Sequence, residues 1–239
     1  MPSLQDIRRR IRSVKNTQQV TKAMKMISAV KLRKSQDRLL ALRPYASKLH
    51  ALVAEVIGRF EHDPNQVSPL AAAFLNPREE RRIHMVLVAS DKGLCGGFNA
   101  NVLKAAEAFL QDTPAEVIRL DVIGKRAVDW SRKRRIEGAI PHTNLSQEAL
   151  ASLASELAEA AVRAYAAGEI DALYILHNQF ASAISQRPEA VKVFPVPVPT
   201  TSNVRIGHLL EPDPVTVLEA LLPRFVEVEV LRSFLESAT

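Results

Sequence analysis

Residues 4–43 read LQDIRRRIRSVKNTQQVTKAMKMISAVKLRKSQDRLLALR, a stretch with neither proline nor glycine. Its apolar residues recur at steps of three and four, at Leu4, Ile7, Ile11 and Val14. The same phase returns downstream at Leu39, Leu42, Ala46, Leu49, Val53 and Val56. This spacing predicts one long helix whose apolar seam packs along another helix. From Ser3 to Ile57 it would reach roughly 80 Å, and we expect Pro44 to bend or interrupt it.

The middle of this seam is polar. Its register there is occupied by Gln18, Thr21, Lys25, Ser28 and Ser35, with Leu32 as the one apolar member. The apolar residues move to an adjacent stripe of Val20, Met24, Ile27 and Val30. We therefore expect the central turns of the helix to face different surroundings from its ends.

The positive charge of the chain is concentrated in its first fifty residues. Thirteen Lys and Arg stand there against two acids, so this arm carries +11 and the rest −5, because the whole chain carries +6. Such an arm is typical of a site for an acidic partner, nucleic acid or an anionic membrane surface. Nucleic acid is the weakest of these, because Tyr45 is the only aromatic residue of the arm and no binding motif is present. A merely solvated outer face of a coiled coil is the alternative.

Composition limits the class of protein. A chain of 239 residues with 47% hydrophobic content can bury a core, which predicts one globular unit besides the long helix. Cys95 is the only cysteine, so no intramolecular disulfide can form, as suits a reducing compartment. The N-terminus lacks a signal-peptide core, and no segment has the length and hydropathy of a membrane span. We expect a protein of the cytoplasmic side that can dock on a membrane complex without inserting.

The remainder of the chain alternates between strand and helix patterns. Strands are predicted at 83–89, 117–123 and 172–177, and helices at 99–111, 124–135 and 147–167. This order predicts an α/β fold with a doubly wound, Rossmann-like parallel sheet. Residues 191–200 alternate apolar residues with proline and fit only an edge strand or an extended segment.

A last helix is predicted over 215–239, despite Pro223, and it is expected to return antiparallel along the first. Residues 59–82 are rich in turn residues and read as a connector, with a short helix at 70–75. The expected units are a coiled-coil shaft helix (1–58), a connector (59–82), an α/β domain (83–210) and the start of a second shaft helix (211–239).

The turn at 90–99, SDKGLCGGFN, follows the first strand, where phosphates often bind in α/β domains. Neither phosphate-binding glycine pattern fits it, so we interpret Gly93, Gly96 and Gly97 as residues of a tight structural turn that needs positive φ. A free α/β nucleotide-binding protein centred on this turn is the alternative function. No spacing pairs Cys95 with a histidine, and the six histidines form no metal-binding motif. The sequence thus predicts no catalytic, cofactor-binding or metal-binding residue.

Three stretches together resemble the gamma subunit of F-type ATP synthases of the bacterial type. They are residues 7–24 (IRRRIRSVKNTQQVTKAM), residues 90–99, and residues 211–214 (EPDP) with 221–224 (LLPR). The resemblance implies a rotor shaft that couples proton flow through a membrane ring of c subunits to ATP synthesis or hydrolysis. Its partners would be the α and β subunits, the epsilon subunit and the c ring, with catalysis in β. The alternative from a different class is a basic helical adaptor for nucleic acid.

The resemblance also assigns roles to residues of the first helix. Lys22, Met24, Lys25, Lys31, Arg33 and Lys34 would slide past acidic lever regions of β, while Leu4, Ile7, Ile11 and Val14 would hold the antiparallel partner helix. With one cysteine and no transit peptide, the bacterial plasma membrane is the expected location, on its cytoplasmic face. Family members continue past residues 236–239 with a long helix, so we expect the sequence as given to lack part of the axle and to expose the seam from Leu4 to Leu32.

Overall fold

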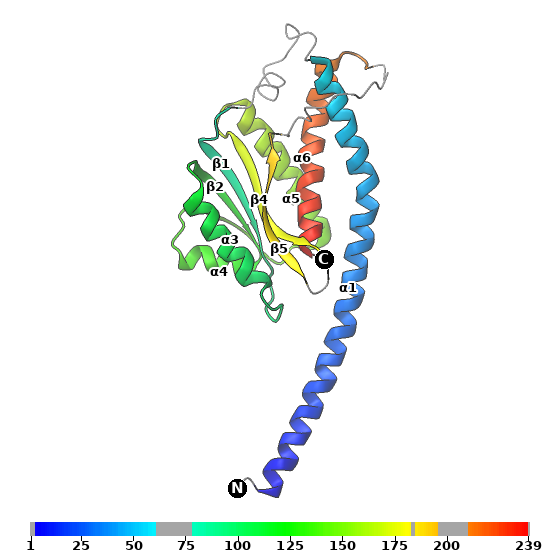
Figure 1. Ribbon diagram of the computed structural model, residues 1–239, viewed down its shortest axis with the longest axis vertical. Helices are drawn as coiled ribbons and strands as arrows, with labels where there is room; N and C mark the ends of the chain where they lie inside the picture. Colours follow the sequence, from blue (N-terminus) through cyan, green and yellow to red (C-terminus); the bar gives the residue numbers. More distant parts are fainter. Residues whose placement is uncertain (1–2, 61–77, 183–184, 196–209, 239) are drawn as a thin grey trace.

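The computed structural model describes residues 3–60, 78–182, 185–195 and 210–238. A single helix, α1 (Leu4–Phe60), runs far past the rest of the molecule, as the sequence predicted (Figure 1). Pro44 stands inside α1 without ending it, so the expected interruption is wrong. Pro44 and Leu40 are both exposed, so water can bind the carbonyl that the proline leaves without a donor.

A five-stranded sheet forms the body, in the order β3-β2-β1-β4-β5. The strands are β1 (Arg82–Val88), β2 (Glu116–Ile123), β3 (Ile140–His142), β4 (Ala172–Phe180) and β5 (Gln186–Phe194). The first four are mutually parallel, and β5 pairs with β4 in the antiparallel direction. The doubly wound α/β prediction is confirmed, with an antiparallel edge strand added to it.

Helices cover both faces of this sheet. One face carries α3 (Phe98–Asp112) and α4 (Lys125–Lys133), which pack on Ile83, Met85 and Leu87. The other face carries α5 (Gln147–Ala166) and α6 (Pro214–Ala238), which pack on Val86 and Val88 (Figure 1). Alternate residues of β1 thus enter opposite cores, and this explains its nearly continuous apolar sequence.

Helix α6 runs antiparallel to the second half of α1 and lies between it and the sheet (Figure 1). The predicted seam is confirmed there, because its residues Ser35, Leu39, Ala46, Leu49, Val53 and Val56 are all buried. Residues of α1 and α6 belong to the same hydrophobic core as β1 and α5. The shaft helices and the sheet are therefore joined by one continuous apolar interface.

Two predicted elements differ at their ends. β4 continues to Phe180 because it forms a hairpin with β5, which begins at Gln186, five residues before the predicted extended segment. The predicted helix at 70–75 and the part of the extended segment at 196–200 lie outside the described residues. The unit boundaries at 58, 82 and 210 stay predictions.

Candidate functional site: an exposed basic helix and a glycine-rich turn

The first half of α1 is the most unusual surface of the molecule. Every residue from Ser3 to Lys31 is exposed. The helix starts with reciprocal hydrogen bonds, because Asp6 N donates to Ser3 Oγ (3.2 Å) and Ser3 N donates to Asp6 Oδ2 (3.1 Å). Within the described part of the chain, no basic residue from Arg8 to Arg33 forms an ion pair. This half of α1 offers unpaired positive charge along its whole length.

The six residues predicted to contact a partner all lie on exposed turns of α1. They do not share one face. With 3.6 residues per turn, Met24 and Lys31 fall on one side of the helix, and Lys22 and Arg33 fall on the opposite side. Lys25 and Lys34 lie between these two sides. The basic surface therefore surrounds the helix, and a partner could meet it from any direction.

The four seam residues near the N-terminus do share a face, as steps of three and four require. They are exposed by 45–67%, at Leu4, Ile7, Ile11 and Val14. The expected exposure of the seam is confirmed at these four residues, whereas Leu32, at the other end of the expected range, is half-buried. Val20, Met24, Ile27 and Val30 form a second exposed apolar stripe.

The glycine-rich turn is closed by hydrogen bonds between its two ends. Ser90 N donates to Asn99 Oδ1 (3.0 Å), and Asn99 Nδ2 donates to the carbonyl of Lys92 (3.3 Å). Positive φ occurs at Gly96 (58°) and at Leu94 (65°), whereas Gly93 and Gly97 have no positive φ. Only Gly96 of the three glycines therefore has the backbone conformation that the sequence suggested for all of them. Leu94, at the tip, is 95% exposed.

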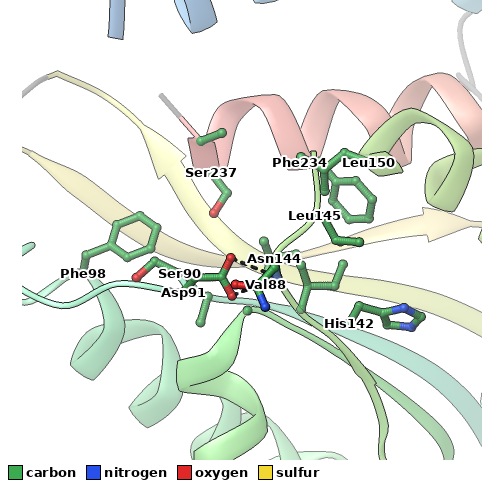
Figure 2. A pocket seen from close by; sticks show the side chains of 14 residues that line it. Val88, Ser90, Asp91, Phe98, His142, Asn144, Leu145, Leu150, Phe234 and Ser237 are labelled. Carbon is green, nitrogen blue, oxygen red and sulfur yellow. Dashed lines mark hydrogen bonds between the residues drawn. The ribbon is translucent and has the colours of Figure 1, made fainter. Parts of the chain in front are cut away.

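Asp91 caps the N-terminus of α4 and links it to the loop after β3. Its Oδ1 accepts a hydrogen bond from the backbone N–H of Lys125, the first residue of α4 (3.0 Å). Its Oδ2 accepts from the backbone N–H of Asn144 (3.2 Å), a contact drawn in Figure 2. A carboxylate at a helix N-terminus satisfies the free N–H groups and the helix dipole. It would also repel an anion at the start of α4, whereas α3, the helix that follows the turn, has Gly97 as its N-cap and no side-chain cap.

A pocket of about 200 Å³ lies beside Asp91, where β1 and β2 end and α6 finishes (Figure 2). Figure 2 shows Ser237 pointing into it from the end of α6, across from Ser90 and Asp91. The walls are mostly apolar. Its lining residues are Val88, Ala89, Ser90, Asp91, Phe98, Ile123, Gly124, His142, Asn144, Leu145, Leu150, Phe234, Ser237 and Ala238. The carboxylate of Asp91 already accepts hydrogen bonds from backbone N–H groups. Cys95 is exposed outside the pocket, where its Sγ accepts a hydrogen bond from Asn99 Nδ2 (3.0 Å), and no histidine is among its described partners. Among the described residues that line the pocket, no nucleophile is paired with an activating base.

A buried charged cluster, which the sequence did not predict, joins the first three strands. Asp121 is fully buried and accepts hydrogen bonds from His84 Nε2 (2.7 Å), His142 Nε2 (2.8 Å) and Arg119 Nε (2.9 Å). Burial alone would raise the pKa of Asp121, but these three hydrogen bonds outweigh it and hold the pKa well below its usual range. Burial, the largest cause, and the charge of Arg119 lower the pKa of His84, although its contact with Asp121 acts to raise it. The cluster is a satisfied structural network. The signal available in the sequence was a polar residue inside each of two apolar strands.

The described residues contain no group of three or more His, Cys, Asp or Glu side chains arranged to hold a metal ion. None of the helices in that part of the chain is long and apolar enough to cross a membrane.

Comparison with known proteins places these features in a family. A family profile described as ATP synthase matches residues 3–239. The ATP synthase gamma chain of Anaeromyxobacter sp. (strain Fw109-5) is 41% identical, and the match covers 100% of this chain and 82% of that protein. The gamma chain of Solibacter usitatus is 42% identical with the same coverage, and that of Desulfitobacterium hafniense is 40% identical, with 99% and 81% covered.

A solved structure supports the fold. The central stalk of the mitochondrial ATP synthase of Tetrahymena thermophila superposes with a TM-score of 0.63 over 92% of each chain, at 18% identity. At that identity the likeness concerns the arrangement of the long helices and the sheet.

Proposed function

This chain belongs to the gamma-chain family of ATP synthases, and from that premise we propose that the exposed half of α1 is the part of a rotor shaft that meets the nucleotide-binding subunits. The chain is the non-catalytic shaft subunit of the complex, and ATP chemistry takes place in the β subunits. The sheet with α3, α4 and α5 is its foot. One observation carries the assignment of the contact surface: the uninterrupted exposure of α1 from Ser3 to Lys31, beyond the reach of the foot.

The partners follow from this assignment. The exposed half of α1 would turn within the ring of α and β subunits, and the foot would rest on the c ring and bind the epsilon subunit. A shaft changes the state of a surrounding site only if it contacts the conformers of that site unequally. The contacts of this chain with the surrounding subunits would be unequal, because apolar and basic residues alternate around α1 and the foot lies to one side of the shaft (Figure 1).

The basic side chains suit a contact that must slide. Lys22, Lys25, Lys31, Arg33 and Lys34 are long, exposed and solvated. Exposed ion pairs contribute only about 0–1 kcal/mol each, so they attract an acidic surface without fixing one position. Met24, which is 46% exposed, adds a flexible apolar contact among them.

The seam residues have a different role. Leu4, Ile7, Ile11 and Val14 would pack against an antiparallel helix, in the register that Leu49 and Val53 already use against α6. We propose with this role that the chain is divided into a shaft helix (1–58), a connector (59–82), the foot (83–210) and the start of a second shaft helix (211–239).

We further propose that the complex lies at the bacterial plasma membrane, with this chain peripheral on its cytoplasmic face. Support comes from the relatives that match at about 40% identity, which are bacterial proteins, and from the lack of any membrane-spanning helix among the described residues.

A charge-matched pair of variants tests the contact surface. The shaft variant carries Lys31→Gln, Arg33→Gln and Lys34→Gln; the foot variant carries Lys104→Gln, Arg132→Gln and Lys133→Gln, and all six residues are exposed. Each is co-expressed with the α, β and epsilon subunits, and ATP hydrolysis by the purified complex is measured. We expect the shaft variant to lose about three- to tenfold of its activity and the foot variant to retain it. Equal activity in both variants would show that the basic residues of α1 form only a solvated surface.

A further inference from the structure

Helix α6 lies between α1 and the foot, yet its apolar surface gives it little rotational preference. Buried or partly buried apolar residues lie around most of its circumference, at Val217, Leu218, Leu221, Leu222, Phe225, Val226, Val228, Val230, Leu231 and Phe234. A helix that is apolar all round can pack in several rotations at similar cost. Torque passing between shaft and foot acts directly on this interface, so some other feature must fix its register.

A continuous set of polar side chains crosses this interface. His50 Nε2 on α1 contacts Glu229 Oε1 on α6 at 2.8 Å, and the ring of His50 also packs edge-on against Phe225. Arg232 Nη1 lies 3.4 Å from Glu229 Oε2, and Arg232 Nε lies 3.5 Å from Glu236 Oε1. Glu236 Oε2 lies 3.4 Å from His177 Nε2 on β4. We call His50, Glu229, Arg232, Glu236 and His177 the polar network.

Much of the polar network is buried, so its charged groups need partners within the protein. His177 and Glu229 are buried, with side chains 1% and 9% exposed, and Glu236 is 19% exposed. The hydrogen bond from His177 lowers the pKa of Glu236 against the effect of burial, with Arg232 and Arg43 as further cationic neighbours. His177 Nδ1 and Arg232 Nε are buried without a hydrogen-bond partner. A turn of α6 by one residue would direct both carboxylates at apolar neighbours, which is strongly unfavourable for a charge without a partner.

We propose that the polar network fixes the rotational register of α6 between α1 and β4, and thereby carries torque between the shaft and the foot. This inference rests on the proposed shaft function. The five residues of the polar network are positioning residues, because they act through α6. Buried polar groups that select one register among similar apolar packings are the best supported use of such groups.

The test measures protons pumped per ATP hydrolysed, in membrane vesicles that carry the complex assembled on this chain. Glu236→Leu removes the link to β4. Glu236→Gln keeps an acceptor for His177 and serves as the conservative variant. Glu219→Leu makes the same change at an exposed position of the same helix and is the matched control. We expect Glu236→Leu to lower the pumped-to-hydrolysed ratio by about threefold, with Glu236→Gln and Glu219→Leu close to the unsubstituted chain.

A double variant separates register from stability. His177→Leu with Glu236→Leu replaces both partners by apolar groups, and such replacements often restore stability. We expect the thermal midpoint of the complex to recover while the ratio stays low. Recovery of the ratio together with the midpoint would overturn the proposal, as would a normal ratio in Glu236→Leu. If the unsubstituted chain fails to assemble with α and β, the shaft function itself is overturned and the torque role with it. If it assembles and pumps, any failure belongs to the polar network alone.

Discussion

His84 and Asp121 make the stability of the body depend on pH at the scale of single side chains. The pKa of His84 is lowered on folding, so its contribution is complete above about pH 6.5, the ordinary histidine value, and falls as the pH drops towards the folded pKa. The pKa of Asp121 is also lowered, so its contribution is complete above about pH 4 and is lost on further acidification. Both effects have the same sign, and acid destabilises the fold in two steps.

We therefore expect the free energy of unfolding to fall as the pH drops from about 7 to about 5, and to fall less in the variant His84→Gln. Urea unfolding followed by circular dichroism at several pH values measures both. Asp121→Ala, which leaves His84, His142 and Arg119 without their shared acceptor, should cost about 1–3 kcal/mol at neutral pH. An identical pH slope in His84→Gln and the unsubstituted chain would contradict this account.

Gly124 offers a second test at residue scale, because it combines strain with a close backbone contact. Its φ is 89°, and a Cβ there would lie 2.3 Å from the carbonyl oxygen of Ala89. Gly138 also has a positive φ (75°), but a Cβ there would meet nothing within 4 Å. Gly138→Ala should lower the free energy of unfolding by about 1–2 kcal/mol, because backbone strain is the only cost there. Gly124→Ala should cost at least about 3 kcal/mol, because β1 and the start of α4 must separate. Denaturant unfolding compares the two, and equal losses would show that the contact relaxes freely.

At the scale of elements, the two halves of α1 should behave differently. Ser3–Lys31 has no tertiary contact that buries it, whereas Leu49 and Val53 belong to the core. Isolated helices are marginal in water, so the first half depends on partners for its stability. We expect its amides to exchange with deuterium much faster than those of residues 46–57 in the free chain, and to become protected in the complex.

Substitutions in the two halves of α1 should also differ. In the free chain, Leu49→Ala should lower the free energy of unfolding by about 2–5 kcal/mol and Ile11→Ala by far less, as measured by thermal unfolding.

The same contrast shows what the sequence could predict. Periodicity is a local property, so the seam from Ser35 to Val56, the strands β1, β2 and β4 and the helices α3 to α6 could be read from spacing. β3 was missed because three residues, one of them Pro141, are too short to show alternation. The Asp121 cluster and the polar network were missed because they join residues far apart in the chain, such as His50 and Glu229. Only the packing of strands and helices brings these side chains together, and no single segment carries their pattern.

At the scale of the whole molecule, charge is separated along the long axis. The first fifty residues carry +11 and the rest −5, and most of that positive charge lies on exposed turns that extend away from the body. A long, one-sided field of this kind accelerates encounter with an acidic surface, and salt screens it over about 8–10 Å. Because the exposed ion pairs are individually weak, their effect should appear in the rate of association more than in the final stability of the complex.

Stopped-flow mixing of the full chain with purified α and β subunits tests this. Between about 50 mM and 300 mM salt, the association rate constant should fall by about tenfold or more for the unsubstituted chain. The variant with Lys31→Gln, Arg33→Gln and Lys34→Gln should associate more slowly at low salt and respond less to added salt, while unfolding at the same temperature, because exposed substitutions change stability by only about 0.5 kcal/mol. The foot variant with Lys104→Gln, Arg132→Gln and Lys133→Gln should match the unsubstituted chain. If only the shaft variant loses the salt response, the charge along α1 guides the encounter. An equal loss in both variants would show instead that the net charge of the chain guides it.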